Sequence, residues 1–157
     1  MSQMAQRGPF LLLFALNQQL GSLLGQAMAG APLRPADFAV YSALRLLQPT
    51  TPTDLATALG MRVTTLSSLL AKMERQGHLR RERNPADGRS RLISLTATGQ
   101  RATEDCFPGF GAAIEAFRRH LTMDEPQVLR HLEEISQALV AASRELAGQQ
   151  GRRFEAG

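Results

Sequence analysis

Apolar residues recur at three- and four-residue steps along most of this chain, which is the spacing of helices that bury one face. The first such stretch covers residues 8–29, and its apolar surface is wide enough to predict burial on more than one side. A second helix is expected from about Pro35 to Leu47. Thr96 begins a long helix that Pro108 should kink near its middle, and a last amphipathic helix reaches Leu146.

Shorter elements are predicted in the middle of the chain. Thr51-Pro52-Thr53-Asp54 combines a hydroxyl cap, a proline at the first helical position and an acid near the positive end of the helix dipole. Gly60 should close that helix in the left-handed conformation, and the next helix is expected from near Thr64 to Gln76. Two strands, Leu79 to Arg83 and Arg91 to Leu95, flank a turn-rich tip and predict a β-hairpin.

These elements predict a mainly α fold with a small β-hairpin wing, that is, a winged helix-turn-helix with N- and C-terminal dimerisation helices. Residues 1–33 would form the N-terminal dimerisation helix, residues 34–96 the winged helix-turn-helix, and residues 97–157 the C-terminal dimerisation helices. An isolated amphipathic helix cannot keep its apolar stripe in water. The terminal helices should therefore pack together, most economically in a homodimer.

Charge is distributed unevenly along the chain. The formal net charge is only +4, yet residues 62–101 hold nine Lys and Arg side chains against three Asp and Glu. A basic middle between mildly acidic ends predicts a polyanion-binding face, although a solvated charged hairpin would give the same count. No apolar run approaches the ~20 residues that span a bilayer, and a single cysteine fits a reducing compartment. We therefore expect a cytoplasmic protein that does not associate with a membrane.

The two helices between Thr51 and Gln76 have the pattern of a helix-turn-helix, and the second presents short polar side chains opposite its leucines. An α-helix fits the major groove of duplex DNA, where small hydroxyls let its backbone approach the base edges. The hairpin that follows can lie along the neighbouring backbone and insert an arginine into the minor groove. The sequence therefore predicts binding to double-stranded DNA through Arg62, Thr64, Thr65, Ser67, Ser68, Lys72, Arg80, Arg83, Asp87, Arg89 and Arg91.

Asp87 and Arg89 lie in the predicted tip of the hairpin. We expect the Asp87 carboxylate to orient Arg89 by a charge-assisted contact and to keep it extended. The alternative is that Asp87 only forms the turn and that the arginines stay solvated.

Several short runs of residues resemble those of a known family. They are Leu55-Ala56, Leu59, Leu69-Leu70, Met73-Glu74, Gly77-His78-Leu79-Arg80-Arg81, Asn84-Pro85-Ala86-Asp87-Gly88-Arg89-Ser90, Leu92-Ile93-Ser94-Leu95-Thr96 and Gly99. With them the whole chain resembles the multiple-antibiotic-resistance-regulator (MarR) family, most specifically in its D-x-R wing followed by L-T and a helix. Ser67, Ser68 and Ala71 depart from the residues usual in that family, so its base specificity is not carried over to this chain.

The resemblance implies a triangular dimer whose two wings straddle a pseudo-palindromic DNA site. It also implies a cleft between the DNA-binding and dimerisation regions that accepts small aromatic or phenolic effectors. Phe14, Asn17, Tyr41 and Arg45 are the effector-binding residues expected in that architecture, because an aromatic box with one cation suits a small aromatic acid. Phe14 and Tyr41 would alternatively be ordinary core residues. The implied function is that of a homodimeric repressor that an effector releases from DNA. Activation of transcription is the alternative.

Other reactive residues are expected to be structural. Cys106 follows Glu104 and Asp105, which oppose ionisation of the thiol, so we expect packing and not redox sensing. The three histidines lack the spacing of metal ligands, and we expect neither a metal nor a cofactor. The sequence contains no Gly-rich phosphate loop, nucleophile elbow or paired His and acid motif, so we expect no enzyme activity.

Two other functions fit the same sequence. In the first, the winged helix docks on an acidic protein and binds no DNA. In the second, Arg7, the apolar stretch from Pro9 to Leu16 and Ala29-Gly30-Ala31 form a secretory signal, and the mature chain begins after Ala31. Against export, polar residues follow the apolar stretch at once and the helical periodicity continues to Met28.

Overall fold

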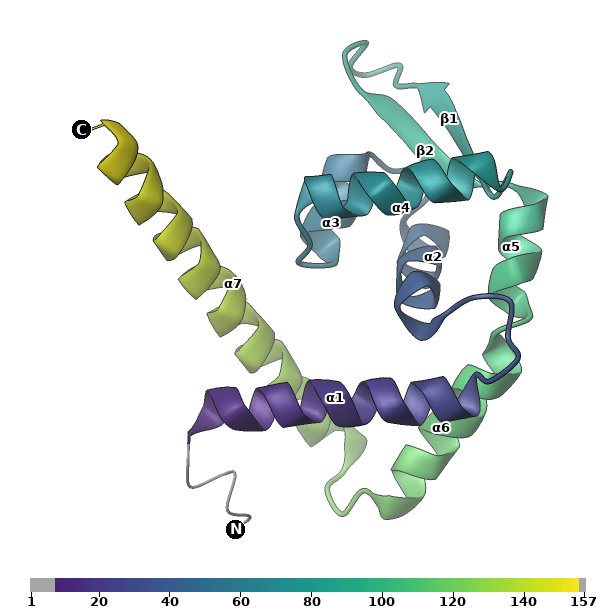
Figure 1. Cartoon of the computed structure of the whole chain (residues 1–157), viewed down its shortest axis with the longest axis vertical. Coiled ribbons are helices and arrows are strands. Elements are labelled where there is room, and N and C mark those ends of the chain that lie inside the picture. Colours follow the sequence, from purple (N-terminus) through teal and green to yellow (C-terminus); the bar gives the residue numbers. More distant parts are fainter. Residues whose placement is uncertain (1–7, 156–157) are drawn as a thin grey trace. The chain divides into compact units, whose positions relative to one another are not determined.

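The computed structural model describes residues 8–155 of the 157, and the side chains of residues 8–149. The chain forms two compact units, Met1–Phe117 and Arg118–Gly157, and the first is called the larger unit below. The elements follow the order α1 (Pro9–Ala27), α2 (Pro35–Leu47), α3 (Pro52–Ala58), α4 (Val63–Arg75), β1 (Leu79–Arg83), β2 (Arg91–Leu95), α5 (Ala97–Glu104), α6 (Phe107–His120) and α7 (Glu125–Glu155) (Figure 1). This order confirms the mainly helical fold with a β-hairpin. The predicted residues 1–7 of the first segment lie outside the described residues.

The helix-turn-helix forms as its sequence signals predict. The Thr51 hydroxyl accepts a hydrogen bond of 3.1 Å from the main-chain N–H of Asp54, which satisfies one of the free donors at the start of α3. Gly60 ends the helix with φ of +62°, a conformation that costs other residues strain. Three apolar side chains of α4 are fully buried and fix its inner face: Leu66, Leu70 and Met73.

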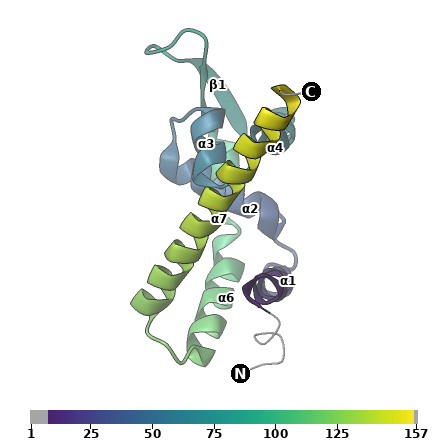
Figure 2. The same ribbon diagram turned by 90° about the vertical axis from the view of Figure 1, so that its left-hand side faces the viewer.

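The hairpin has the predicted strand boundaries. β1 and β2 pair antiparallel from Leu79 opposite Leu95 to Arg83 opposite Arg91. The base of the hairpin is tied to the loop between α2 and α3, where Thr50 and Ile93 exchange main-chain hydrogen bonds of 2.8 and 3.3 Å. Beyond this anchor the hairpin projects past α3 and α4, as Figure 2 shows from the side.

The predicted kink after Thr96 is a complete break between two helices. α5 ends at Glu104 and α6 begins at Phe107, so that Pro108 occupies the first turn of a new helix. Proline has no N–H to donate to the carbonyl of Glu104, four residues earlier, and its ring would clash with that carbonyl. A Cβ atom at Gly109 would lie 2.5 Å from the carbonyl oxygen of Ala27, so α6 can pass the end of α1 only with glycine at this position.

The helices at the two ends of the chain expose their apolar residues. In the described chain α1 has no buried residue, and the phenyl rings of Phe10 and Phe14 are 74% and 64% exposed. The broad burial expected for this helix is thus not met within a single copy. Leu132, Ile135 and other apolar residues of α7 are exposed as well. None of the described helices is both long enough and apolar enough to span a bilayer.

Candidate functional site

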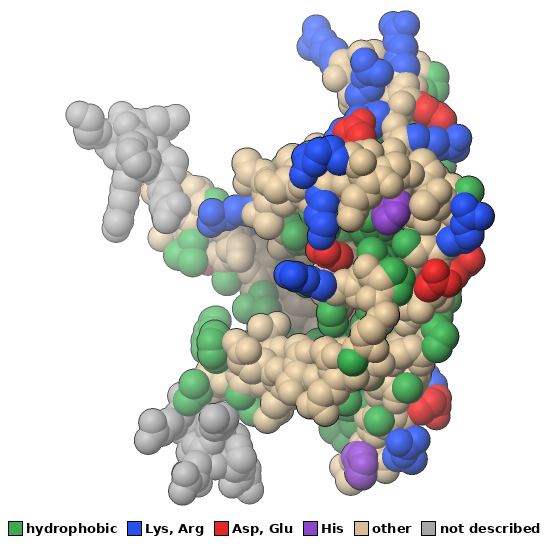
Figure 3. All heavy atoms as spheres, turned by 45° about the vertical axis from the view of Figure 1, so that its right-hand side comes forward, with side chains coloured by type: hydrophobic (Ala, Val, Ile, Leu, Met, Phe, Trp, Pro, Cys, Tyr) green, Lys and Arg blue, Asp and Glu red, His purple; other side chains and the backbone are tan. Residues whose placement is uncertain are grey.

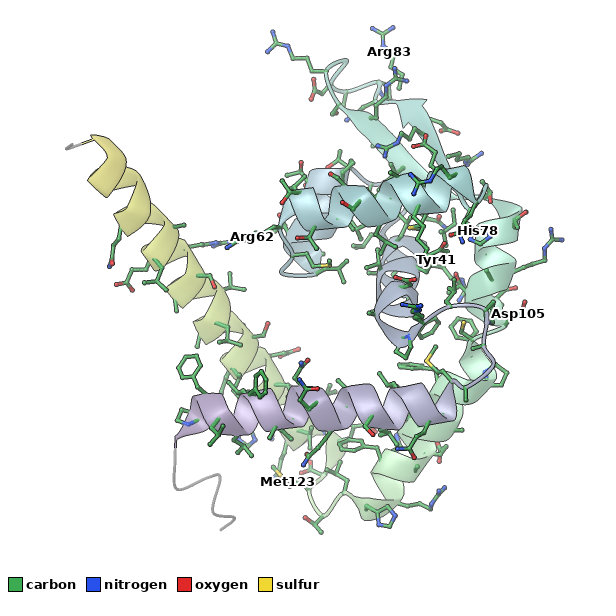
Figure 4. The ribbon with its side chains drawn as sticks, in the orientation of Figure 1. Tyr41, Arg62, His78, Arg83, Asp105 and Met123 are labelled. Carbon is green, nitrogen blue, oxygen red and sulfur yellow. The ribbon has the colours of Figure 1, made fainter. Side chains whose placement is uncertain are left out.

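The outer face of α4 consists of small hydroxyl side chains. Thr64, Thr65, Ser67 and Ser68 are all exposed, on the side opposite the three buried residues of this helix. The Ser67 hydroxyl donates a hydrogen bond of 2.7 Å to the carbonyl oxygen of Val63, so it offers only its lone pairs to an outside partner. Arg62 precedes the helix as its N-cap residue and extends outward from its start (Figure 4).

The strand register sorts the arginines of the hairpin onto two faces. Because side chains alternate along a strand and Arg83 lies opposite Arg91, these two share a face with Arg81. The Nε atom of Arg81 lies 3.1 Å from Oε2 of Glu74 in α4, so this face is turned toward α4. We call it the arginine face. Figure 3 shows Lys and Arg side chains gathered over the hairpin and α4.

Arg80 lies on the opposite face of the hairpin. Its guanidinium is 3.4 Å from the Glu82 carboxylate, and its neighbours in a surface hollow include Gln48, Pro49 and Gln100. The structure therefore does not bring Arg80 together with the other predicted residues. Arg81, which we did not single out from the sequence as a site residue, occupies the arginine face in its place.

Asp87 organises the tip of the hairpin through the main chain. Its Oδ1 atom accepts a hydrogen bond of 3.0 Å from the main-chain N–H of Arg89, and its carbonyl oxygen accepts from the N–H of Ser90 at 3.1 Å. Asp87 thus contacts Arg89 through the main-chain N–H, as a carboxylate two residues before an N–H readily does when it closes a local turn, and its role in orienting the Arg89 side chain stays a prediction. The Arg89 side chain is exposed at the tip.

Lys72 differs from the other predicted contacts on α4. Its Nζ atom lies 2.7 Å from Oδ2 of Asp37, at the start of α2. The Asp37 side chain is only 21% exposed, against 47% for Lys72, so the ammonium is held against the body of the larger unit. The charge of Lys72 therefore already has a partner within the chain.

An apolar pocket of about 260 Å³ opens within the larger unit. Phenyl rings form much of its wall: the ring centroid of Phe38 lies 6.0 Å from that of Phe107 and 5.0 Å from that of Phe110. Its other lining residues are Leu24, Pro35, Ala39, Ser42, Arg45 and Leu46. The buried hydroxyl oxygen of Ser42 has no hydrogen-bond partner in the described residues. A mainly apolar cavity with one free hydroxyl and one cation can hold an aromatic ring that bears an acid group.

Of the four predicted effector residues, only Arg45 lines this pocket. Its guanidinium carbon lies 5.1 Å from the centre of the Phe107 ring, and it also contacts Glu104 at 3.4 Å. Phe14 and Asn17 are exposed on α1 and are absent from the pocket lining. The sequence analysis did not single out Phe38, Phe107 or Phe110 as effector residues, because nothing in the sequence indicates that these three rings meet.

Tyr41 belongs to the core and not to the pocket. Its side chain is 1% exposed, and its hydroxyl lies 2.9 Å from Nδ1 of His78, at the junction of α4 and β1 (Figure 4). Burial and, secondly, the charge of Asp37 raise the pKa of Tyr41 to about 12. Burial likewise raises the pKa of the Cys106 thiol, which opposes the reactive thiolate that redox sensing requires.

The described residues contain no cluster of three or more His, Cys, Asp and Glu side chains that could hold a metal ion. The arginine face and α4 present cations and hydroxyls, which suit the phosphates and base edges of a nucleic acid. The pocket adds a separate place for a small apolar molecule.

Residues 32–90 match a model of the MarR family. The multiple antibiotic resistance protein MarR of Escherichia coli K12 is 28% identical over 122 residues, which are 77% of this chain and 85% of that protein. A crystal structure of a mutant of E. coli MarR complexed with operator DNA superimposes with a TM-score of 0.73 at 25% identity, covering 87% of this chain and 99% of that one. The transcriptional regulator MOSR of M. tuberculosis, solved with DNA, gives 0.74 at 27% identity and covers 86% and 98%.

The family model covers the helix-turn-helix and the first strand of the hairpin, the two structural matches cover 86–87% of the chain, and the proteins concerned are regulators and not enzymes. The chain is therefore similar to the MarR family of winged-helix transcriptional regulators, over residues 32–90 in sequence and over most of its length in fold.

Proposed function

We propose that this chain is a homodimeric repressor that binds a pseudo-palindromic site in double-stranded DNA and leaves it when a small aromatic acid binds. DNA binding is carried by one observation: the hydroxyl face of α4 and the arginine face of the hairpin belong to the same side of the larger unit, joined by the Arg81 to Glu74 contact. The two relatives solved with DNA support the proposal. Because the proposed target is chromosomal DNA, we place its action in the cytoplasm.

In this proposal α4 enters the major groove. Thr64, Thr65 and Ser68 face the base edges, and Arg62 contacts a phosphate beside the start of the helix. Ser67 accepts a hydrogen bond from a base amino group, since its own proton is used within the helix. Its preferred partners are then adenine N6 and cytosine N4, the two amino groups displayed in the major groove.

The hairpin contributes backbone and minor-groove contacts. Arg83 and Arg91 lie opposite each other on the arginine face, and in this proposal both contact phosphates. Arg89 extends from the tip and enters the minor groove, where a narrow groove attracts a guanidinium. Asp87 supports this contact by closing the turn, and not by touching the DNA.

Dimerisation would cover the exposed apolar side chains of the terminal helices. Phe10 and Phe14 of α1 are largely exposed, and α7 exposes Leu132 and Leu146 to more than half of their surface. Apolar surface of this extent favours association, and a second copy with two-fold symmetry is the most economical partner. The same symmetry would present two recognition helices to two half-sites of the DNA.

The pocket is the proposed effector site. An aromatic carboxylate would insert its ring among Phe38, Phe107 and Phe110, and it would direct its carboxylate to Arg45 and the free hydroxyl of Ser42. The carboxylate must compete with Glu104 for Arg45, but that contact is exposed and 3.4 Å long, and an exposed ion pair of this kind is weak. Benzoate is the simplest probe of this class.

The DNA-binding proposal is tested by fluorescence anisotropy on a labelled duplex selected from a random pool by the protein itself, at several salt concentrations. We expect Arg89→Ala to weaken binding while the dimer stays intact. Arg80→Ala is the matched control, because it removes the same charge from the other face of the same hairpin, and it should change affinity by about twofold at most.

Equal losses in the two variants would mean that the hairpin acts through its total charge, contrary to the proposed arrangement. If the wild-type protein does not bind duplex DNA even at low salt, the DNA-binding proposal is wrong. A winged helix that docks on an acidic protein would then be the better explanation.

A further inference from the structure

Helix α2 contacts both the pocket and α4, the two structural features on which the proposed function depends. One of its faces lines the pocket with Phe38, Ser42 and Arg45, which follow each other at four- and three-residue steps. The neighbouring face, about 100° around the helix axis, carries Asp37 and Tyr41. Both of these residues make polar contacts to α4 or to the turn directly after it.

The contact of Asp37 is the more direct of the two. It joins α2 to the second half of α4 through a distance of 2.7 Å between carboxylate and ammonium, the distance of a charge-assisted hydrogen bond. The contact of Tyr41, 2.9 Å from its hydroxyl to His78, reaches the residue that follows the helix by three positions. α2 is therefore joined to the C-terminal half of α4 and to the residue after it at two points.

We propose that Asp37 and Lys72 form the positioning contact through which occupation of the pocket moves α4, and that Lys72 is a tether to α2 and not a phosphate contact. This inference rests on the proposed function, since it needs both an effector in the pocket and DNA on α4. A ring that enters the pocket displaces Phe38, which is the next residue after Asp37 on the same rigid helix. The Asp37 carboxylate then carries Lys72 with it, and the hydroxyl face of α4 turns relative to the hairpin.

A second ion pair on α4 provides the comparison. Glu74 pairs with Arg81 at 3.1 Å, so it ties α4 to the hairpin and not to the pocket helix. The side chains of Glu74 and Arg81 are 48% and 30% exposed, a range close to that of the Asp37 and Lys72 pair. Asp37→Asn and Glu74→Gln each remove one negative charge beside α4, so their general effects on attraction to DNA are matched.

The experiment measures the coupling factor, which is the ratio of duplex affinity without and with saturating benzoate. Benzoate affinity for the free protein is measured by calorimetry, and folding by thermal melting. We expect benzoate affinity to stay within about twofold in both variants. Glu74→Gln loosens the contact between α4 and the hairpin and should lower duplex affinity equally with and without benzoate, so the ratio of the two affinities should keep its wild-type value. Asp37→Asn should lower the coupling about fivefold, which corresponds to about 1 kcal/mol at 1.4 kcal/mol per factor of ten. Asp37→Glu should restore most of it.

Lys72→Met breaks the same ion pair from the other side and provides a second variant should Asp37→Asn not fold. It should lower the coupling as Asp37→Asn does. Its slope of log affinity against log salt should equal the wild-type slope, because the number of phosphates that the protein neutralises does not change.

Unchanged coupling in the Asp37 and Lys72 variants, or an equal loss in Glu74→Gln, would overturn the inference. If the slope of log duplex affinity against log salt falls by about one for each Lys72 replaced, the ammonium contacts phosphate. The claim that Lys72 only tethers α4 to α2 would then be wrong. Failure of benzoate to bind or to release DNA from the wild-type protein would instead overturn the proposed effector function, and the inference with it.

Discussion

The buried phenol of Tyr41 offers a direct test of how α2 is held against the end of α4. Tyr41 is the only tyrosine in the sequence, and the sequence has no tryptophan, so near-ultraviolet absorbance follows the ionisation of this one group. Burial, assisted by the charge of Asp37, raises the pKa of Tyr41 from 10.0 to about 12. We predict that this phenol stays largely protonated when the pH rises from 10 to 11 and ionises only near pH 12, for as long as the protein stays folded.

The raised pKa has a consequence for stability, whose sign follows from proton linkage. Between pH 10 and pH 12 the unfolded chain releases the Tyr41 proton while the folded chain keeps it. The free energy of unfolding therefore falls as the pH rises through this window, and the contribution is fully present only below pH 10. Two pKa units correspond to about 3 kcal/mol, a large part of the stability of a small domain.

The assay combines an absorbance titration with urea unfolding at several pH values, on the wild-type protein and on Tyr41→Phe. We expect the tyrosinate signal of the folded protein to appear near pH 12, and that of the protein in concentrated urea near pH 10. Tyr41→Phe should lose about 2 kcal/mol less stability between pH 10 and pH 12, since it has no phenol to ionise. A folded-state transition at pH 10, or equal pH dependence in the two proteins, would refute the burial of Tyr41 against His78.

Three further predictions concern the cap, the close helix contact and the hairpin. Thr51→Ala should lower the free energy of unfolding by about 1 kcal/mol because it removes the cap of α3, and equal melting temperatures for the variant and the wild type would contradict this. Gly109→Ala should lower the free energy of unfolding by about 1–3 kcal/mol because the added Cβ meets the carbonyl oxygen of Ala27. Gly111→Ala is the control, because a Cβ there meets nothing within 4 Å, and equal melting temperatures for the two variants would contradict this prediction. Arg83→Gln should reduce the slope of log DNA affinity against log salt by about 0.9 for each phosphate that is no longer neutralised, and an unaltered slope in salt titrations would remove Arg83 from the interface.

Much of the larger unit could be predicted from sequence because its signals are local. The caps at Thr51 and Gly60, and the alternating pattern of the two strands, depend on residues within one turn or one hairpin. Each of these elements also buries its predicted apolar face, so local preference and tertiary packing agree.

The sequence analysis chose Arg80 and not Arg81 as a site residue, although it is Arg81 that lies on the face that is turned toward α4. Arg80 and Arg81 are neighbours in one strand and so lie on opposite faces, and Arg81 shares its face with the buried Leu79 and Ile93. This alternation is visible in the sequence and could have placed Arg81 on the inner face.

The pocket depends on contacts between helices that are distant in sequence. Tyr41 and Phe38 lie on adjacent faces of α2, and both look like core or pocket residues in a periodicity pattern. Only the way α6 packs on α2 places the ring of Phe38 in the pocket and leaves Tyr41 in the core. Helix packing of this kind has no signature in a single sequence.

Hydroxyl-radical footprinting of the wild-type protein on a duplex that it selects from random DNA tests the central claim most directly. A dimer that inserts two copies of α4 should protect two segments whose centres are about one helical turn, or 10 bp, apart. Flanking minor-groove protection should also be present, and it should disappear with Arg89→Ala while the central protection remains. Absence of protection at low salt, or a single protected segment that the Arg89→Ala variant leaves unaltered, would contradict the account.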